Sequence, residues 1–158
     1  YSVLQDKEAA LDDLNSLIKI DSLNALAYWH LGVCQSVSIS LKTKKASDVM
    51  LNIEKSKDYF NKSLALNAQN AFIYYNRANL WAMQKNWKEA LNDYNKAIAL
   101  DPTLAEAYYN KGLVLFELKD VVNATSSLSK AGELGLYKAY SVIKHKKSSI
   151  KNKETKKK

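Results

Sequence analysis

Three residue types are scarce in this chain, and each shortage excludes a class of protein. Cys34 is the only cysteine, so no disulfide can form within the chain. Only four glycines and one proline occur among 158 residues, which disfavours a turn-rich all-β protein and favours long helices with short joints. No apolar run approaches the roughly 18–20 residues that a membrane-spanning helix requires. The composition therefore favours an all-α protein without a transmembrane segment.

Residues that could bind a metal or perform catalysis are also few. His30 and His145 are the only histidines, and neither an HExxH nor a CxxC motif occurs. His30 and Cys34 share one face of a predicted helix, but no third ligand accompanies them. The glycines form no phosphate-binding loop. We therefore expect no catalytic residue, no metal site and no cofactor, and we predict that the protein is not an enzyme.

Positive charge is concentrated at one end of the chain. Residues 138–158 contain nine lysines and one acidic residue, and this excess of eight equals the net charge of the whole chain, +8. Residues 1–137 are therefore neutral. Residues 147–158 are polar and lack aromatic side chains, so we predict a lysine-rich disordered tail. Such a tail could contact nucleic acid or another anionic surface through non-specific electrostatics.

The body of the chain repeats itself with a period of 34 residues. The pairs that carry this period are Ala90 with Ala124, Tyr74 with Tyr108, and Pro102 with Leu136. A 34-residue period with paired helical patterns is the signature of the tetratricopeptide repeat (TPR). Repeat two matches the family frame through Tyr74, Ala78, Trp81, Ala90, Tyr94, Ala97 and Pro102. The chain therefore resembles the TPR family, which implies an all-α, right-handed α-solenoid of helix-turn-helix repeats.

The resemblance divides the chain into six segments. We expect the second helix of a truncated repeat at 1–24, repeats at 25–70, 71–104 and 105–138, a capping helix at 136–146, and the disordered tail at 147–158. The stretch "LSKAGELGLYKAYSVIK" is similar to the C-terminal ends of long repeat proteins from Bacteroidetes-type bacteria. We therefore expect the C-terminal portion of a longer bacterial TPR array.

Repeat one contains an insertion of 12 residues relative to the 34-residue period, within 36–57. We interpret it as two lengthened helices that meet at a polar turn near 43–46, with Ser47 as the N-cap of the second helix. The insertion is either a partner-binding spur or a tolerated surface extension.

Two residue pairs have the spacing of a capping box at a helix start. Asn86 with Glu89, and Thr103 with Glu106, are each three residues apart. In such a box the side chains bond backbone amides that the helix leaves free.

The resemblance also implies where a partner binds, because the first helix of each repeat lines the concave groove of the family's solenoids. Carried over to this sequence, the groove residues are Leu26, Trp29, Val33, Phe72, Tyr75, Asn76, Asn79, Met83, Tyr109, Asn110 and Leu113. Aromatic anchors with a few amides suit an extended or helical protein segment.

The family's best-known ligand is the acidic C-terminus of the chaperones Hsp70 and Hsp90, held by a clamp of lysine, asparagine and arginine. The clamp positions correspond here to Trp29, Val33, Asn76, Glu106 and Asn110. Only one asparagine matches, and Glu106 has the wrong charge for a carboxylate ligand. The sequence therefore disfavours binding of a chaperone tail.

Three hypotheses for the function follow. The first is a non-enzymatic scaffold that binds a protein or peptide in its groove. The alternative is binding of nucleic acid or an anionic surface through the basic tail. The third is self-association through the first helix, where Leu11, Leu14 and Ile18 are expected to be exposed. The sequence assigns neither a compartment nor an individual partner.

Overall fold

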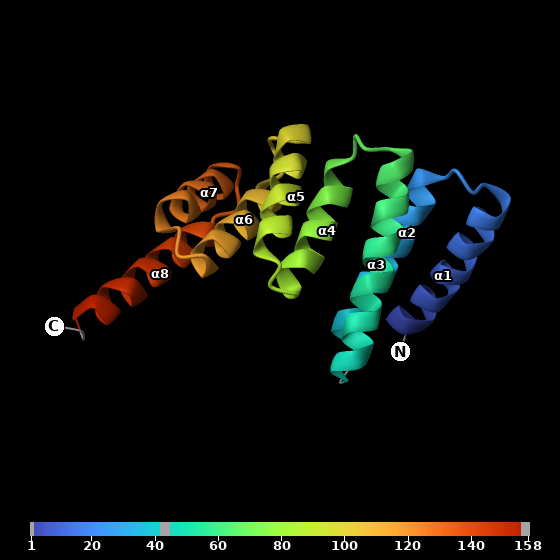
Figure 1. The fold of residues 1–158 in the computed structure, drawn as a ribbon, viewed down its shortest axis with the longest axis horizontal. Helices are drawn as coiled ribbons and strands as arrows, with labels where there is room; N and C mark the ends of the chain where they lie inside the picture. Colours follow the sequence, from blue (N-terminus) through green and yellow to red (C-terminus); the bar gives the residue numbers. More distant parts are fainter. Residues whose placement is uncertain (1, 42–44, 156–158) are drawn as a thin grey trace. The chain divides into compact units, whose positions relative to one another are not determined.

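The computed structural model describes residues 2–41 and 45–155, and these residues form eight α-helices and no strand (Figure 1). The helices are α1 (Ser2–Ile20), α2 (Ala25–Leu41), α3 (Ala46–Leu66), α4 (Ala71–Met83), α5 (Trp87–Leu100), α6 (Ala105–Glu117), α7 (Val121–Glu133) and α8 (Lys138–Thr155). The predicted all-α class is therefore confirmed. The handedness of the array stays a prediction.

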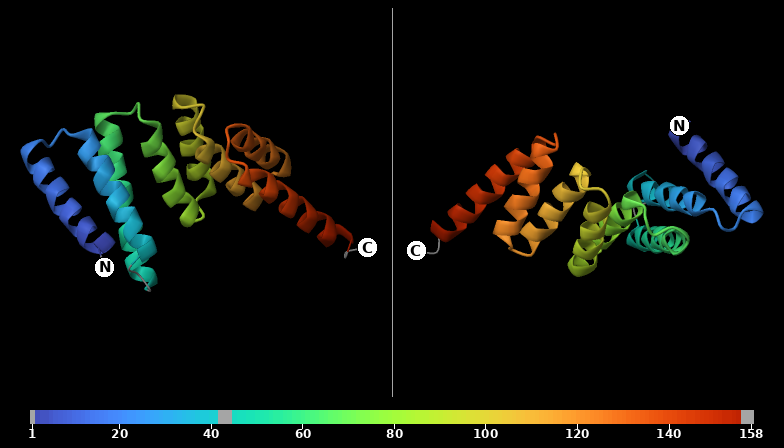
Figure 2. Two further views of the ribbon diagram at one scale, coloured as in Figure 1. Left: turned by 180° about the vertical axis from the view of Figure 1, so that it is seen from behind. Right: turned by 90° about the horizontal axis from the view of Figure 1, so that it is seen from above.

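The helices form two compact units, residues 1–80 and 81–158. Within the first unit, α1 packs on α2, and α2 lies along α3 (Figure 1 and Figure 2). Within the second unit, α6 packs on both α5 and α7, and α7 packs on α8. Each unit is thus built from neighbouring helices that close one another's apolar faces, as repeat architectures require.

The core of the first unit lies between α2, α3 and α4. Ile53, Phe60, Ile73 and Leu80 are almost fully buried there. Gly32 on α2 makes this packing possible, because a Cβ atom at that position would lie only 2.5 Å from Cε1 of Phe60.

The core of the second unit uses small residues on α7 and α8 against larger ones. Leu115, Phe116, Ala124, Leu128, Ala131 and Ala139 form the buried cluster. Gly112 on α6 faces α7 so closely that an added Cβ atom would lie 2.7 Å from Cγ of Leu128. The alanines and glycines of the repeat frame are therefore contact points between helices, as their spacing predicted.

Three joints of the second unit, α4–α5, α6–α7 and α7–α8, share one backbone feature, a residue with a positive φ angle. Lys85 and Lys119 have positive φ angles of 58° and 64°, and Gly135 has φ 98°. After Lys119, the amide of Asp120 donates to the carbonyl oxygen of Leu115 at 2.9 Å, and equivalent bonds close the other two joints. A left-handed residue followed by this backbone bond satisfies carbonyl groups that a helix end leaves free.

Neither predicted capping box forms. Asn86 does precede α5, but its side chain makes no cap hydrogen bond. Leu104, rather than Thr103, is the N-cap of α6, because the Thr103 hydroxyl instead donates to Oδ1 of Asp101 at 2.7 Å. Side-chain caps do form at the starts of α2, α4 and α7, from Asn24, Asn70 and Asp120.

The insertion lengthens the hairpin of α2 and α3. These helices contain 17 and 21 residues, whereas α4 and α6 contain 13 each. Part of the predicted turn, residues 42–44, lies outside the described residues. Ser47 is not the N-cap, since α3 begins at Ala46 and Lys45 precedes it.

The C-terminal segment differs from the prediction of a short cap followed by a disordered tail. A single helix, α8, runs from Lys138 to Thr155, and residues 156–158 lie outside the described part of the chain. Lysine has a good helix propensity, and neither glycine nor proline follows Gly135 to end the helix. The high charge of the segment therefore did not prevent a helix.

Candidate binding surfaces

In the first unit, α2 and α4 bring two predicted groove residues together. The ring centroids of Trp29 and Phe72 are 6.4 Å apart, a separation typical of an aromatic pair. Phe72 is 47% exposed, and Leu26, one helical turn before Trp29, is 56% exposed. These three side chains form an apolar surface that we call the aromatic patch (Leu26, Trp29 and Phe72).

Trp29 is the fixed part of the aromatic patch. Its indole packs against the buried cluster of the first unit, and the His30 ring lies 4.6 Å away, centroid to centroid. Its Nε1 atom is buried and has no hydrogen-bond partner among the described residues. An unpaired buried N–H costs about 1–3 kcal/mol, so packing rather than polar bonding holds this ring. Phe72 and Leu26 are consequently the members most open to a ligand.

The other predicted groove residues of the first unit are less open. Val33 packs against the same buried cluster as Trp29, so its first role is structural. Tyr75, Asn76 and Asn79 are half-buried along α4. The structure thus brings Trp29 and Phe72 into one patch and draws Val33 partly into the core.

Of the predicted groove residues in the second unit, Tyr109 contacts α8. Met83 is 54% exposed, and Tyr109, Asn110 and Leu113 are half-buried on α6. Nζ of Lys138, at the start of α8, lies 4.7 Å from the centre of the Tyr109 ring, which is within range of a cation–π contact. The sequence predicted an apolar Tyr109 and did not reveal this cation.

A second lysine of α8 also contacts α6. Nζ of Lys146 is 3.1 Å from Oε1 of Glu117 and 5.9 Å from the centre of the Phe116 ring. Two lysines of the positively charged C-terminal segment, Lys138 and Lys146, therefore contact α6.

The apolar side chains of α1 are less exposed to solvent than predicted. Leu11, Leu14 and Ile18 are half-buried rather than exposed, because α1 packs against α2. Ile20, at the end of α1, is 86% exposed. The expectation that those three residues form a free apolar face is wrong.

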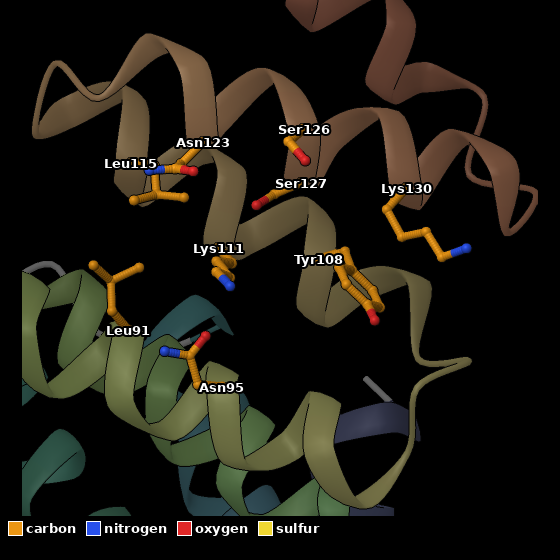
Figure 3. Close-up of a pocket in the computed structure, with 9 residues that line it drawn as sticks. All are labelled: Leu91, Asn95, Tyr108, Lys111, Leu115, Asn123, Ser126, Ser127 and Lys130. Carbon is orange, nitrogen blue, oxygen red and sulfur yellow. The ribbon is translucent and has the colours of Figure 1, made fainter.

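A pocket of about 450 Å³ in the second unit is a candidate site that the repeat pattern did not reveal. Three helices line it, each with residues spaced three or four apart along one face (Figure 3). The lining residues are Leu91 and Asn95 of α5, Tyr108, Lys111 and Leu115 of α6, and Asn123, Ser126, Ser127 and Lys130 of α7.

The pocket lining contains two lysines and no acidic residue. Burial away from water lowers the pKa of Lys111, because a desolvated ammonium group favours its neutral form. Nζ of Lys130 pairs with Oε2 of Glu133 at 3.1 Å, and Nδ2 of Asn123 donates to Oδ2 of Asp120 at 2.7 Å. The pocket is therefore rich in hydrogen-bond donors and carries an excess of positive charge.

Two kinds of feature are absent from the described residues, a cluster of metal ligands and a membrane-spanning helix. These residues contain no group of three or more histidine, cysteine or acidic side chains that could hold a metal ion. None of the helices in residues 2–41 and 45–155 combines the length and apolar character needed to cross a membrane.

Comparison with known sequences identifies one segment. The family model of the TPR repeat matches residues 82–119, which span α5 and α6 with the joints around them. No curated protein sequence matches the chain.

Comparison with solved structures covers almost the whole chain. A crystal structure of MamA is similar with a TM-score of 0.77 at 20% identity, covering 94% of this chain and 81% of that one. The TPR protein TTC0263 of Thermus thermophilus is similar with a TM-score of 0.76 at 14% identity, covering 90% and 74%. The first TPR of Spaghetti (RPAP3), bound to the HSP90 peptide SRMEEVD, is similar with a TM-score of 0.67 at 20% identity, covering 82% and 95%.

The 34-residue period, the helix pairs packed at small residues, the repeat match and the structural neighbours all lead to one family. The chain is a tetratricopeptide repeat protein in its fold, and residues 82–119 carry the repeat's sequence pattern as well.

Proposed function

We propose that this protein is a non-enzymatic scaffold that binds a peptide or protein segment through the helix surfaces that carry the predicted groove residues. The observation that carries the proposal is the aromatic patch. It combines a ring held rigidly by the core, Trp29, with two side chains that stay about half exposed, Phe72 and Leu26. Apolar anchors on a rigid base are typical of residues that dominate binding energy at protein interfaces.

The TPR fold supports this proposal in its general form, since such folds serve as scaffolds for protein–protein interaction. One structural neighbour, Spaghetti, was solved with an HSP90 peptide bound. In this chain Trp29, Val33 and Glu106 stand where a carboxylate clamp would need cations or an amide. We therefore propose a ligand segment with apolar anchor residues rather than an acidic chain end.

The test uses photo-crosslinking from the aromatic patch, followed by an affinity measurement. Benzoylphenylalanine replaces Phe72 in one protein and Tyr137, which is 74% exposed in the second unit, in a matched control. We expect a protein segment to be crosslinked from position 72 but not from position 137, and mass spectrometry identifies that segment.

The affinity of the identified segment is then measured by calorimetry for Phe72→Ala and Tyr137→Ala. We expect Phe72→Ala to weaken binding about 30-fold, as loss of an interface hot spot does, and Tyr137→Ala to change it less than twofold. Equal crosslinking from both positions, or an affinity that Phe72→Ala leaves unchanged, would contradict the proposal.

The alternative function, binding of nucleic acid or an anionic surface, draws on one observation. Because α8 continues to Thr155, the lysine-rich segment is a helix over most of its length. This alternative predicts that affinity for a single-stranded oligonucleotide falls steeply as salt rises. It also predicts that the affinity disappears when residues 147–158 are deleted, while the segment crosslinked at position 72 is unaffected.

A further inference from the structure

The pocket of the second unit is separate from the predicted groove residues. None of its lining residues belongs to that set. On α6 the pocket is lined by Tyr108, Lys111 and Leu115, which form a different stripe of the helix from Tyr109, Asn110 and Leu113. A ligand held in the pocket therefore uses a surface that the proposed scaffold function leaves free.

Two polar groups in the pocket lack protein partners. Neither the ammonium group of Lys111 nor the hydroxyl of Ser127 forms a hydrogen bond or ion pair within residues 2–41 and 45–155. The Ser127 residue is nevertheless 8% exposed in total. Figure 3 shows the Lys111 amine directed toward the Asn95 amide of α5, and Ser127 lines the same pocket from α7. Unpaired donors that face a pocket are available to a ligand that supplies acceptors.

The charge balance indicates a ligand with a single negative charge. Lys130 is already paired with Glu133, which leaves Lys111 as the lining cation without an acidic partner among the described residues. One ammonium group balances one carboxylate. A phosphate dianion would keep an uncompensated charge in a site where water is partly excluded.

The remaining lining gives the ligand an apolar part. Leu91 and Leu115 contribute aliphatic side chains, and Tyr108 contributes its ring. Sites for small molecules typically combine such apolar walls with a few convergent polar groups.

We propose that this pocket binds a carboxylate group carried by a small aliphatic moiety. Lys111 pairs with the carboxylate, Ser127 and Asn95 donate hydrogen bonds to it, and Leu91 and Leu115 contact the aliphatic part. The same chemistry occurs in a free short-chain acid and in the C-terminal residue of a peptide.

The experiment titrates the full chain with 4-methylpentanoate and follows backbone amide signals by NMR. The uncharged amide of the same acid, 4-methylpentanamide, tests the need for charge, and inorganic phosphate tests the class of anion. The peptide Ala-Ala-Leu, with a free or an amidated C-terminus, distinguishes a chain end from a free acid as the source. Lys111→Met removes the cation, and Lys88→Met, an exposed lysine on α5 outside the pocket, is the matched control.

We expect 4-methylpentanoate to shift amide signals of Lys111, Ser127 and Asn95. Lys111→Met should weaken binding at least about tenfold, the factor for loss of one charge-assisted hydrogen bond, and Lys88→Met should change it less than twofold. If the peptide with a free C-terminus binds more tightly than 4-methylpentanoate, the ligand is a peptide chain end. If 4-methylpentanoate binds more tightly, the ligand is a free acid. Ser127→Ala serves as a second variant, with a smaller loss expected.

Three results would overturn the proposal. The first is equal binding of 4-methylpentanoate and its amide, which would mean that the charge is not recognised. The second is an affinity that Lys111→Met leaves unchanged while its far-UV circular dichroism matches the parent protein. The third is tighter Lys111-dependent binding of phosphate than of any carboxylate.

Discussion

Gly112 shows how a single missing side-chain atom determines the packing of α6 against α7. An added Cβ atom would lie 2.7 Å from Cγ of Leu128 and 3.1 Å from the carbonyl oxygen of Ala124. The leucine could shift, but the carbonyl oxygen belongs to a helix backbone that is held by its own hydrogen bonds. The two helices therefore approach each other as closely as glycine permits.

Substitution of this glycine tests that close approach. Gly112→Ala gains about 1 kcal/mol in helix propensity but overpacks the contact, which costs about 1–3 kcal/mol. We expect a net loss of about 1 kcal/mol in the free energy of unfolding, measured by urea denaturation. In a Leu128→Ala background the same substitution should be neutral or stabilising, because the space is then free. An equal loss of unfolding free energy in both backgrounds would show that overpacking against Leu128 is not the cause.

At the residue scale, the sequence predicted which side chains are buried in the core. It did not predict which side chains form hydrogen bonds with neighbouring residues at the helix starts. The 34-residue spacing identified Ala90, Ala124 and Leu128 as packing positions, and all three are buried. It did not predict that Asp101 would capture the Thr103 hydroxyl. Two residue types that both favour caps compete for the same backbone groups, and spacing alone does not determine which one bonds.

At the scale of the helix, the start of α7 depends on one carboxylate. Oδ1 of Asp120 accepts from the Asn123 amide at 3.2 Å, and Oδ2 accepts from the Asn123 side chain at 2.7 Å. These hydrogen bonds, the side-chain bond first, hold the pKa of Asp120 below its ordinary value. The charged form is therefore favoured in the folded state.

This lowered pKa makes stability depend on pH with a definite sign. A carboxyl group whose pKa is lower in the folded state stabilises the fold above its unfolded pKa, about 3.9, and the stabilisation is lost as pH falls through the folded pKa. We expect Asp120→Ala to lower the melting temperature by a constant amount between about pH 5 and 7, and the difference from the parent to shrink below about pH 4.

The matched variant for this cap is Asn123→Ala, which removes only the side-chain donor. The pKa of Asp120, measured by carbonyl NMR, should move back toward its ordinary value in this variant. If the pKa did not move, the side-chain bond would not be the cause of the shift.

The joint between α6 and α7 offers a stabilising substitution. Lys119 has a φ angle of 64°, and a left-handed conformation costs an ordinary residue about 1–2 kcal/mol. Glycine adopts it freely but loses more entropy on folding, so we expect Lys119→Gly to raise the free energy of unfolding by about 0.5–1 kcal/mol. Lys88→Gly, inside α5, should lower it by up to about 1 kcal/mol. Stability changes of the same sign in the two variants would contradict this account.

The helix ends were harder to predict from the sequence than the helices themselves. The repeats predicted at 71–104 and 105–138 contain the helix pairs α4 with α5 and α6 with α7, but α8 runs to Thr155 where a disordered tail was predicted. Charge composition describes how readily a segment could stay solvated. It does not describe helix propensity, or the contacts of Lys138 and Lys146 with α6.

At the scale of the whole molecule, each unit has its own buried cluster. We therefore expect local rather than uniform loosening when one core is weakened. Phe60→Leu should accelerate hydrogen exchange in α2 and α3 and leave α6 and α7 protected, and Leu128→Val should do the reverse. Each substitution is expected to cost about 1–3 kcal/mol. Uniform acceleration along the chain in both variants, measured by mass spectrometry, would show a single cooperative unit instead.

The sequence predicted the architecture of the molecule better than its sites. A repeat pattern records the positions that must be alike in every copy, and these determine the fold. The pocket around Lys111 is lined partly by positions that differ between copies, such as Asn95 and Ser126, so no repeat pattern marks it. The sequence placed the three residues of the aromatic patch among the predicted groove residues, but only the structure shows that Trp29 packs against the core while Phe72 is about half exposed.

The recurrence of one joint at Lys85 and Lys119, 34 residues apart, has a consequence for how such a chain can grow. A gene segment encoding residues 87–120, copied in tandem, would join Asp120 to a second Trp87 in the same way that Asn86 already joins the first. The new boundary would fall just after a left-handed residue, where a helix is about to start. Duplication could therefore lengthen the array by a whole repeat without the need for a new loop to evolve.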